Sequence, residues 1–255
     1  MRKSLFRYSG NKGRLLEYLP RPPPGTRRII EPFLGSGSYT LSHRYAGLGV
    51  DADPNVISLW KFLQEVSPEE LRSLDRWWEE RKLSQPPANL PEIEKEFGKG
   101  ASLYFKINVC GVYVGQWSSN LPYPQHPLPV DKTIDALPEA KKIDVRHGDW
   151  RSVREDLREG DAVFFDPPYL GTSGNYRGEE SFDPSKIPSE ILSWGVPVLF
   201  TYGTGAPEIF PELSWELLLK RKVPRLRGGG TIEREEWVAR INWPREEDVL
   251  DMFGF

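Results

Sequence analysis

The chain has 255 residues, enough to bury a full hydrophobic core as one α/β domain with an insertion or as two small domains. Its net charge of −3 and pI near 5.8 argue against a wholly basic, histone-like binder, although a local basic patch remains compatible with them. Cys110 is the only cysteine, so an intrachain disulfide is excluded and we expect a reducing compartment.

Neither a metal site nor a membrane anchor is predicted. The three histidines, His43, His126 and His147, show no metal-ligand spacing among themselves or with Cys110. The basic start of the chain lacks a following apolar segment, and no stretch approaches the ~20 apolar residues of a membrane-spanning helix. We therefore expect a soluble, cytoplasmic protein.

The first polar, glycine-rich stretch covers residues 7–13, contains Lys12 and precedes a short helical pattern at 14–19. A Gly-x-x-Gly loop with a lysine can wrap a small anionic group, and a flexible terminus explains the same composition equally well. Prolines between residues 20 and 25 then separate this stretch from a first predicted strand at 28–33.

A glycine-containing turn at 34–38 follows that strand and leads into a predicted helix at 39–46. Glycines at such a turn let a ligand approach the backbone closely. Thr40 stands where a dinucleotide fingerprint needs its third glycine, so a pyrophosphate-bearing cofactor is disfavoured and a nucleoside-type ligand is not.

The second predicted strand, residues 48–50, ends at Asp51. Nucleoside-binding α/β folds place an acid at this position because a carboxylate can accept from both ribose hydroxyls. The same segment offers Asp53 or Asn55 as an N-cap for the helix expected at 56–66, and both roles can hold together.

The strand–helix alternation stops between residues 67 and 140. This segment contains a charged helix at 69–82, a proline-rich loop, an apolar, aromatic run at 103–114 and a polar loop at 116–120. Such inserts commonly carry specificity on an α/β frame, and a stabilising helical cap is the alternative. We expect residues 1–66 and 141–255 to form the frame and residues 67–140 a small, mainly helical inserted subdomain.

A third strand at 143–146 runs into Asp149 and Trp150. The acid can accept from an amino nitrogen and the indole can stack on a purine. The suspected binding residues thus follow successive strand ends, which is where open α/β sheets bind ligands.

The fourth strand, residues 162–165, ends in Asp166-Pro167-Pro168-Tyr169. The two prolines fix an extended exit and leave the carbonyls of Asp166 and Pro167 free to accept hydrogen bonds beside the ring of Tyr169. Such a cluster suits a flipped-out base that carries an amino group. Asp-Pro-Pro is also common turn chemistry, so the motif alone leaves both interpretations open.

The remaining elements are a long loop at 170–183, typical of a lid, a fifth strand at 197–202 and a hairpin with arms at 215–222 and 236–241. Residues 220–227 include five basic residues and no acidic one, enough to contact DNA phosphates, although such tips are often merely solvated. The basic residues are Lys220, Arg221, Lys222, Arg225 and Arg227.

In this order, the elements resemble the Dam-type (D12 class) adenine-N6 DNA methyltransferases. The matching segments are residues 7–12, 31–37, 147–150 and 166–169. The resemblance implies a Rossmann-like methyltransferase sheet, mostly parallel with a C-terminal antiparallel hairpin, and S-adenosylmethionine as cofactor. The residues that it implies as cofactor contacts are Tyr8, Lys12, Phe33, Gly35, Gly37, Asp51, Asp149, Trp150 and Asp166.

The resemblance also implies a reaction on double-stranded DNA. A flipped-out adenine would present its N6 hydrogens to Asp166 and the Pro167 carbonyl while Tyr169 stacks on the base, and acceptors on both hydrogens favour a nucleophilic nitrogen. The insert and the basic hairpin would contact DNA, and a cognate restriction endonuclease is a possible partner. Residues 108–111 match the family pattern only loosely, which leaves the recognised sequence open.

Two other functions fit parts of the pattern. Related motifs occur in enzymes that methylate cytosine N4 or a base in RNA, but Asp166 before the prolines and the N-terminal lysine loop favour adenine in DNA. A non-catalytic DNA-binding relic of a methyltransferase would have lost cofactor residues, and these are present.

Overall fold

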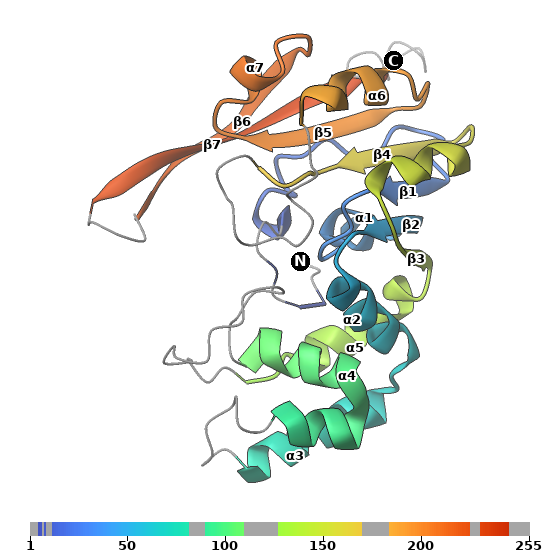
Figure 1. Ribbon diagram of the computed structural model, residues 1–255, viewed down its shortest axis with the longest axis vertical. Coiled ribbons are helices and arrows are strands. Elements are labelled where there is room, and N and C mark those ends of the chain that lie inside the picture. The colour runs from blue at the N-terminus through green and yellow to red at the C-terminus, as the bar shows by residue number, and fades with distance from the viewer. Residues whose placement is uncertain are drawn as a thin grey trace.

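The computed structural model describes residues 5–6, 8, 12–81, 90–109, 127–169, 184–224 and 230–244. A seven-stranded sheet forms its centre, in the order β3-β2-β1-β4-β5-β7-β6 (Figure 1). Neighbours from β3 to β5 pair in parallel, whereas β7 pairs antiparallel to both β5 and β6. The strands are β1 (Arg28–Glu31), β2 (Ala46–Asp51), β3 (Ile143–His147), β4 (Asp161–Phe165), β5 (Val198–Gly203), β6 (Trp215–Pro224) and β7 (Thr231–Ile241).

This topology confirms the expected Rossmann-like methyltransferase sheet with its C-terminal antiparallel hairpin. The strand order reverses at β1, since β2 lies on one side of it and β4 on the other. In open α/β sheets, ligands bind at such a switch point, outside the carboxyl ends of the strands, which here are those of β1 and β4.

Of the helices that the structure describes, the two longest lie in the segment predicted as an insert. Among the described residues, none is both long and apolar enough to cross a membrane. The helices are η1 (Lys12–Arg14), α1 (Ser38–His43), α2 (Pro54–Glu65), α3 (Pro68–Arg81), α4 (Leu90–Val109), α5 (Val130–Ala140), η3 (Trp150–Asp156), η5 (Pro184–Lys186), α6 (Ile187–Leu192) and α7 (Ala206–Ile209).

Two predicted helices differ from the structure. The pattern at 14–19 forms turns after the single 3-10 turn η1, in which the Lys12 carbonyl accepts from the amides of Leu15 and Leu16. The helix expected at 39–46 ends earlier because Arg44 adopts a left-handed conformation with φ 61°, and the chain then enters β2 at Ala46. Periodicity alone did not reveal either stop.

Asp53, one of the two predicted N-caps, caps helix α2, which begins at Pro54 and therefore two residues before the expected start. The side chain of Asp53 accepts from the amide of Asn55 at 2.9 Å, and Pro54 occupies the first helical turn, where its missing N–H costs nothing. The cap therefore starts α2 shortly after Asp51, the last residue of β2.

The helices of residues 67–140 lie with α2 at the β3 side of the sheet, in the lower half of Figure 1. One hydrophobic cluster joins Trp60 of α2, Trp78 of α3, Phe105 of α4 and Leu137 of α5. Helix α4 is broken at Gly98, where φ is 84° and ψ is 169°. The helical segment is therefore packed against the frame through α2.

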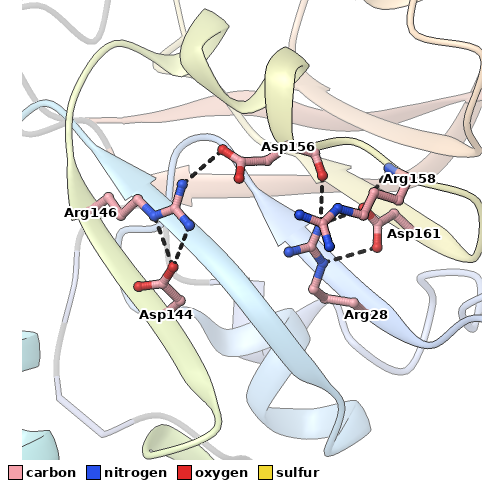
Figure 2. Close-up of polar contacts among 6 residues, drawn as sticks. All are labelled: Arg28, Asp144, Arg146, Asp156, Arg158 and Asp161. Atoms are coloured by element: carbon pink, nitrogen blue, oxygen red, sulfur yellow. Dashed lines mark hydrogen bonds and ion pairs between the residues drawn. The ribbon is translucent and has the colours of Figure 1, made fainter.

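A polar network lies at the amino-terminal ends of β1 and β4, at the other end of these strands from Glu31 and Asp166 (Figure 2). Arg28, the first residue of β1, donates to both oxygens of the buried Asp161 at the start of β4, at 3.0 and 2.7 Å. Arg28 also donates to the carbonyl of Asp156 at 2.8 Å, and the Asp156 side chain pairs with Arg146 at 2.8 Å. These contacts hold the end of η3, whose first residue is Trp150, against the sheet.

Candidate active site

Asp166 is the point on which several elements converge. The five residues of β4 before it are buried, and Asp166 follows directly at the carboxyl end of this strand. Lys12 Nζ lies 2.7 Å from Asp166 Oδ1, and Thr201 Oγ1 of β5 donates to the same oxygen at 2.7 Å. The Tyr169 hydroxyl is 3.5 Å from it. Within the described residues, Oδ2 accepts no hydrogen bond, so one oxygen is anchored while the other remains available.

The ring of Tyr169 is held on two sides. Lys12 Nζ lies 4.7 Å from the ring centroid, and the ring of Tyr202 lies 4.8 Å away at 43°. The Tyr169 hydroxyl donates to Glu236 Oε2 of β7 at 3.1 Å. Gly203 leaves space for the ring, because a Cβ there would lie 2.5 Å from Tyr169 Cδ2. The motif therefore depends on β5 and β7 as well as on β4.

The two prolines between these side chains lie in a segment without helix or strand. Pro167 is buried and Pro168 is partly exposed. Their position keeps Asp166 and Tyr169 close enough for the 3.5 Å contact.

The glycine turn after β1 has a packing role that the sequence analysis did not assign. Gly35 and Gly37 adopt positive φ values of 45° and 58°. A Cβ on Gly35 would lie 2.8 Å from the ring of Tyr8, and one on Gly37 would lie 2.6 Å from the ring of Trp60. Left-handed backbone and close ring packing both require glycine here.

Asp51 lies at the end of β2 with its carboxylate held by backbone amides. Oδ2 accepts from Gly35 N and Oδ1 from Asp53 N, both at 2.9 Å. Burial raises the pKa of Asp51 to about 6. Each carboxylate oxygen can accept a second hydrogen bond, so the group can still bind hydroxyls.

Asp149 is engaged by its own neighbour. It caps η3 by accepting from Arg151 N at 2.9 Å, and the Arg151 guanidinium donates to its two oxygens at 2.7 and 3.0 Å. These hydrogen bonds from Arg151 lower the pKa of Asp149. A ligand amino group would therefore share this carboxylate with Arg151.

Trp150 and Phe33 form an aromatic wall next to β4. Their rings are stacked, with centroids 5.9 Å apart and an interplanar angle of 27°. Phe165 meets both rings edge-on, at 5.1 Å from Phe33 and 5.3 Å from Trp150. The structure thus brings two predicted cofactor residues together.

Glu31, the last residue of β1, is a buried acid that the sequence analysis did not assign. Its Oε1 accepts from the amide and hydroxyl of Thr40 at 2.8 and 2.6 Å, and burial raises the pKa of Glu31 to about 7. The negative charge of Asp166 contributes to this increase. Thr40, which breaks the dinucleotide fingerprint, therefore holds a buried carboxyl group.

The predicted basic hairpin is less positive in space than along the chain. Lys220 Nζ lies 3.0 and 3.1 Å from carboxylate oxygens of Glu233 and Glu235 across the hairpin. Arg221 lies 3.7 Å from Glu236. Antiparallel pairing thus places acidic β7 residues opposite the basic run of β6.

The other basic residues predicted to contact DNA differ in whether the structure describes them. Lys222 is exposed on β6, whereas Arg225 and Arg227 lie outside the described residues. The predicted lid at 170–183, the polar loop at 116–120 and most of the N-terminal loop also lie outside them.

Thr201, Gly203 and Glu236 are the residues next to the motif that sequence reasoning missed. Thr201 belongs to the predicted fifth strand, Gly203 directly follows that predicted strand, and Glu236 begins the predicted second hairpin arm. Their contacts follow from the sheet order β4-β5-β7, which carries no local sequence signal.

The sheet has the strand order of a Rossmann-like methyltransferase fold, and an acid-proline-proline-aromatic motif follows β4. No family model matches the chain. The chain is 27% identical over 234 residues to a DNA N-6-adenine-methyltransferase of Escherichia phage P1. The match covers 81% of this chain and 30% of the phage protein's length. It is 22% identical over 228 residues to a DNA adenine methylase of Escherichia coli K12, covering 78% and 80% of the two chains.

Similarity to solved structures is low. The C-terminal domain of precorrin-6Y C5,15-methyltransferase from Rhodobacter capsulatus is 10% identical, with a TM-score of 0.41, over 92% of this chain and 94% of that chain. The sequence similarities support methyltransferase activity for this chain.

Proposed function

We propose that this chain is a site-specific DNA adenine-N6 methyltransferase that acts on a flipped-out adenine in duplex DNA with S-adenosylmethionine. The observation that carries the proposal is the end of β4, where Lys12 and Thr201 anchor one oxygen of Asp166 beside the ring of Tyr169. The names of the sequence relatives support adenine in DNA as the target.

The residues at the end of β4 suit an aromatic amine as nucleophile. The N6 lone pair of adenine is delocalised into the ring, so the free base is a poor nucleophile. Asp166 Oδ2 and the Pro167 carbonyl accept the two N6 hydrogens, which favours a more tetrahedral nitrogen with a localised lone pair. The Tyr169 ring stacks on the base and orients it. The carboxylate of Asp166 is also placed to accept the proton that the nitrogen loses.

Bound S-adenosylmethionine supplies an electrophilic methyl group on its sulfonium. Asp51 fits the ribose because both of its oxygens keep acceptor capacity, and the wall of Phe33 and Trp150 fits the cofactor's adenine. The other residues that we assign to cofactor binding are Tyr8, Lys12, Gly35, Gly37, Asp149 and Asp166.

Catalysis and DNA binding are assigned to different parts of the chain. We infer that residues 1–66 and 141–255 carry catalysis, while residues 67–140 and the hairpin basic residues bind the duplex. A restriction endonuclease that cuts the same site is a possible partner.

The test is transfer of a labelled methyl group from the cofactor to duplex DNA by the purified protein. We expect the label as N6-methyladenine after digestion. Label found only in RNA, or as N4-methylcytosine, would contradict the proposal. Sequencing of methylated positions in DNA from an expressing host then identifies the recognised site.

A cofactor titration separates an enzyme from a DNA-binding relic. We expect the wild type to bind S-adenosylmethionine and Asp51→Ala to bind it more weakly. Absence of binding by the wild type, or equal binding by both proteins, would favour the relic.

A further inference from the structure

Glu236 connects the C-terminal hairpin to the Asp-Pro-Pro-Tyr motif. It lies on β7 opposite Gly203 of β5 and is 9% exposed. Its two oxygens have different partners, since Oε2 accepts from the Tyr169 hydroxyl at 3.1 Å and Oε1 faces Arg221 Nη2 at 3.7 Å. A buried carboxylate therefore lies between a hairpin cation and the tyrosine of the motif.

The Tyr169 hydroxyl has one proton, and it has two acidic neighbours among the described residues. Its oxygen is 3.1 Å from Glu236 Oε2 and 3.5 Å from Asp166 Oδ1. Hydrogen bonds weaken as the distance increases, so the proton lies toward Glu236. Glu236 thereby directs the phenol away from Asp166.

The hydrogen bond also determines where the ring lies. The missing side chain of Gly203 lets the ring approach β5, and Tyr202 packs against it at 4.8 Å. These contacts confine the ring in two directions, and the bond to Glu236 fixes its hydroxyl end.

We propose that Glu236 is a positioning residue for methyl transfer. It holds the Tyr169 ring in the plane that stacks on the target base and keeps the phenol proton off Asp166. This inference rests on the proposed function, because it assigns Tyr169 to the flipped adenine.

The test is a double-mutant cycle read by single-turnover methyl transfer to duplex DNA. Tyr169→Phe keeps the ring and removes the hydroxyl, whereas Glu236→Ala removes the acceptor. Each should slow transfer about 10-fold to 100-fold, the factor that corresponds to one hydrogen bond to a charged group. The double variant should be no slower than the slower single variant, because both changes remove the same contact.

Further variants separate this role from a purely structural one. Glu236→Gln keeps an acceptor for the phenol and should restore part of the rate lost in Glu236→Ala. Glu216→Gln is the matched control, since Glu216 is an exposed hairpin glutamate whose ion-pair partner is Arg240 at 3.1 Å. It should leave the rate unchanged. S-adenosylmethionine affinity should stay at the wild-type value in every variant.

Three outcomes decide the inference. Additive losses in the double variant would overturn it and show that Glu236 acts independently of Tyr169, for example through Arg221. Equal rates of the Gln and Ala variants at position 236 would overturn it as well. A wild type that methylates no DNA would instead contradict the proposed function, so the two failures are distinguishable.

Discussion

The two oxygens of Asp166 have different surroundings, and this asymmetry is the main residue-scale feature of the site. Lys12 and Thr201 both lie 2.7 Å from Oδ1, which fixes the rotamer of the carboxylate. Within the part of the chain that the structure describes, Oδ2 accepts no hydrogen bond, and we assign this oxygen to the substrate amine. An aspartate without these anchors would lose much of this orientation.

Thr201→Val should therefore slow methyl transfer while leaving cofactor affinity unchanged. Valine keeps the shape of the buried threonine but donates no hydrogen bond to Asp166. We expect a decrease of about 10-fold to 100-fold in the single-turnover rate, from the loss of one charge-assisted bond. Thr26→Val is the matched control, because the Thr26 hydroxyl donates to the carbonyl of Pro23. An equal decrease in both variants would contradict this role.

Asp51 should make cofactor binding depend on pH. Burial raises its pKa to about 6, so the side chain carries a proton below that pH and loses acceptor capacity for ribose hydroxyls. Affinity for S-adenosylmethionine should therefore rise as pH increases through about 6, by about 10-fold between pH 5 and 7. Titration calorimetry across this range measures the change. The same dependence in Asp51→Asn would assign it to another group.

At the scale of elements, the hairpin shows how strand pairing changes a charge pattern. The basic run of β6 is followed in sequence by a glycine-rich tip, but β7 folds back and places glutamates opposite it. Cations that are already paired gain less from a phosphate. The exposed Lys222 and the tip residues are consequently the better candidates for DNA contact.

Substitution of Lys222, Arg225 or Arg227 by glutamine should weaken binding to duplexes of any sequence. Each loss should reduce the slope of log affinity against log salt by about 1. Lys220→Gln should have a smaller effect because Glu233 and Glu235 already pair with its ammonium group. Lys142→Gln serves as a control, since Lys142 pairs with Glu139 beside α5. Unchanged salt slopes would mean that the hairpin is only solvated.

At the scale of the whole molecule, the helices of residues 67–140 are coupled to the sheet. Large side chains of α2, α3, α4 and α5 share one hydrophobic cluster, so the insert and the frame bury surface against each other. Separate cores would allow the two parts to unfold independently. A shared core predicts that they unfold together.

We expect one cooperative thermal transition with the same midpoint by circular dichroism and by tryptophan fluorescence. Trp78→Ala in α3 should lower this midpoint for both probes, because removal of a fully buried tryptophan costs about 3–5 kcal/mol. Trp78 is 1% exposed and packs against Phe105 of α4. Arg76→Ala, an exposed change on the same helix, is the control. Two separate transitions would show that the insert is an independent unit.

The sequence by itself determined the α/β class, the strands that lead to Asp51, Asp149 and Asp166, and Asp53 as one of two candidate N-caps. Local signals suffice for these features, because apolar runs, turn residues and capping side chains act over a few residues. The motif and the N-terminal lysine were likewise evident from their residue types.

Only the tertiary structure decided which residues meet. Lys12 and Asp166 are separated along the chain by the whole of residues 67–140, yet the two form an ion pair. Thr201 and Glu236 reach the motif because β5 and β7 follow β4 in the sheet. Strand order depends on non-local pairing and on the burial of both sheet faces, so no short sequence window contains it.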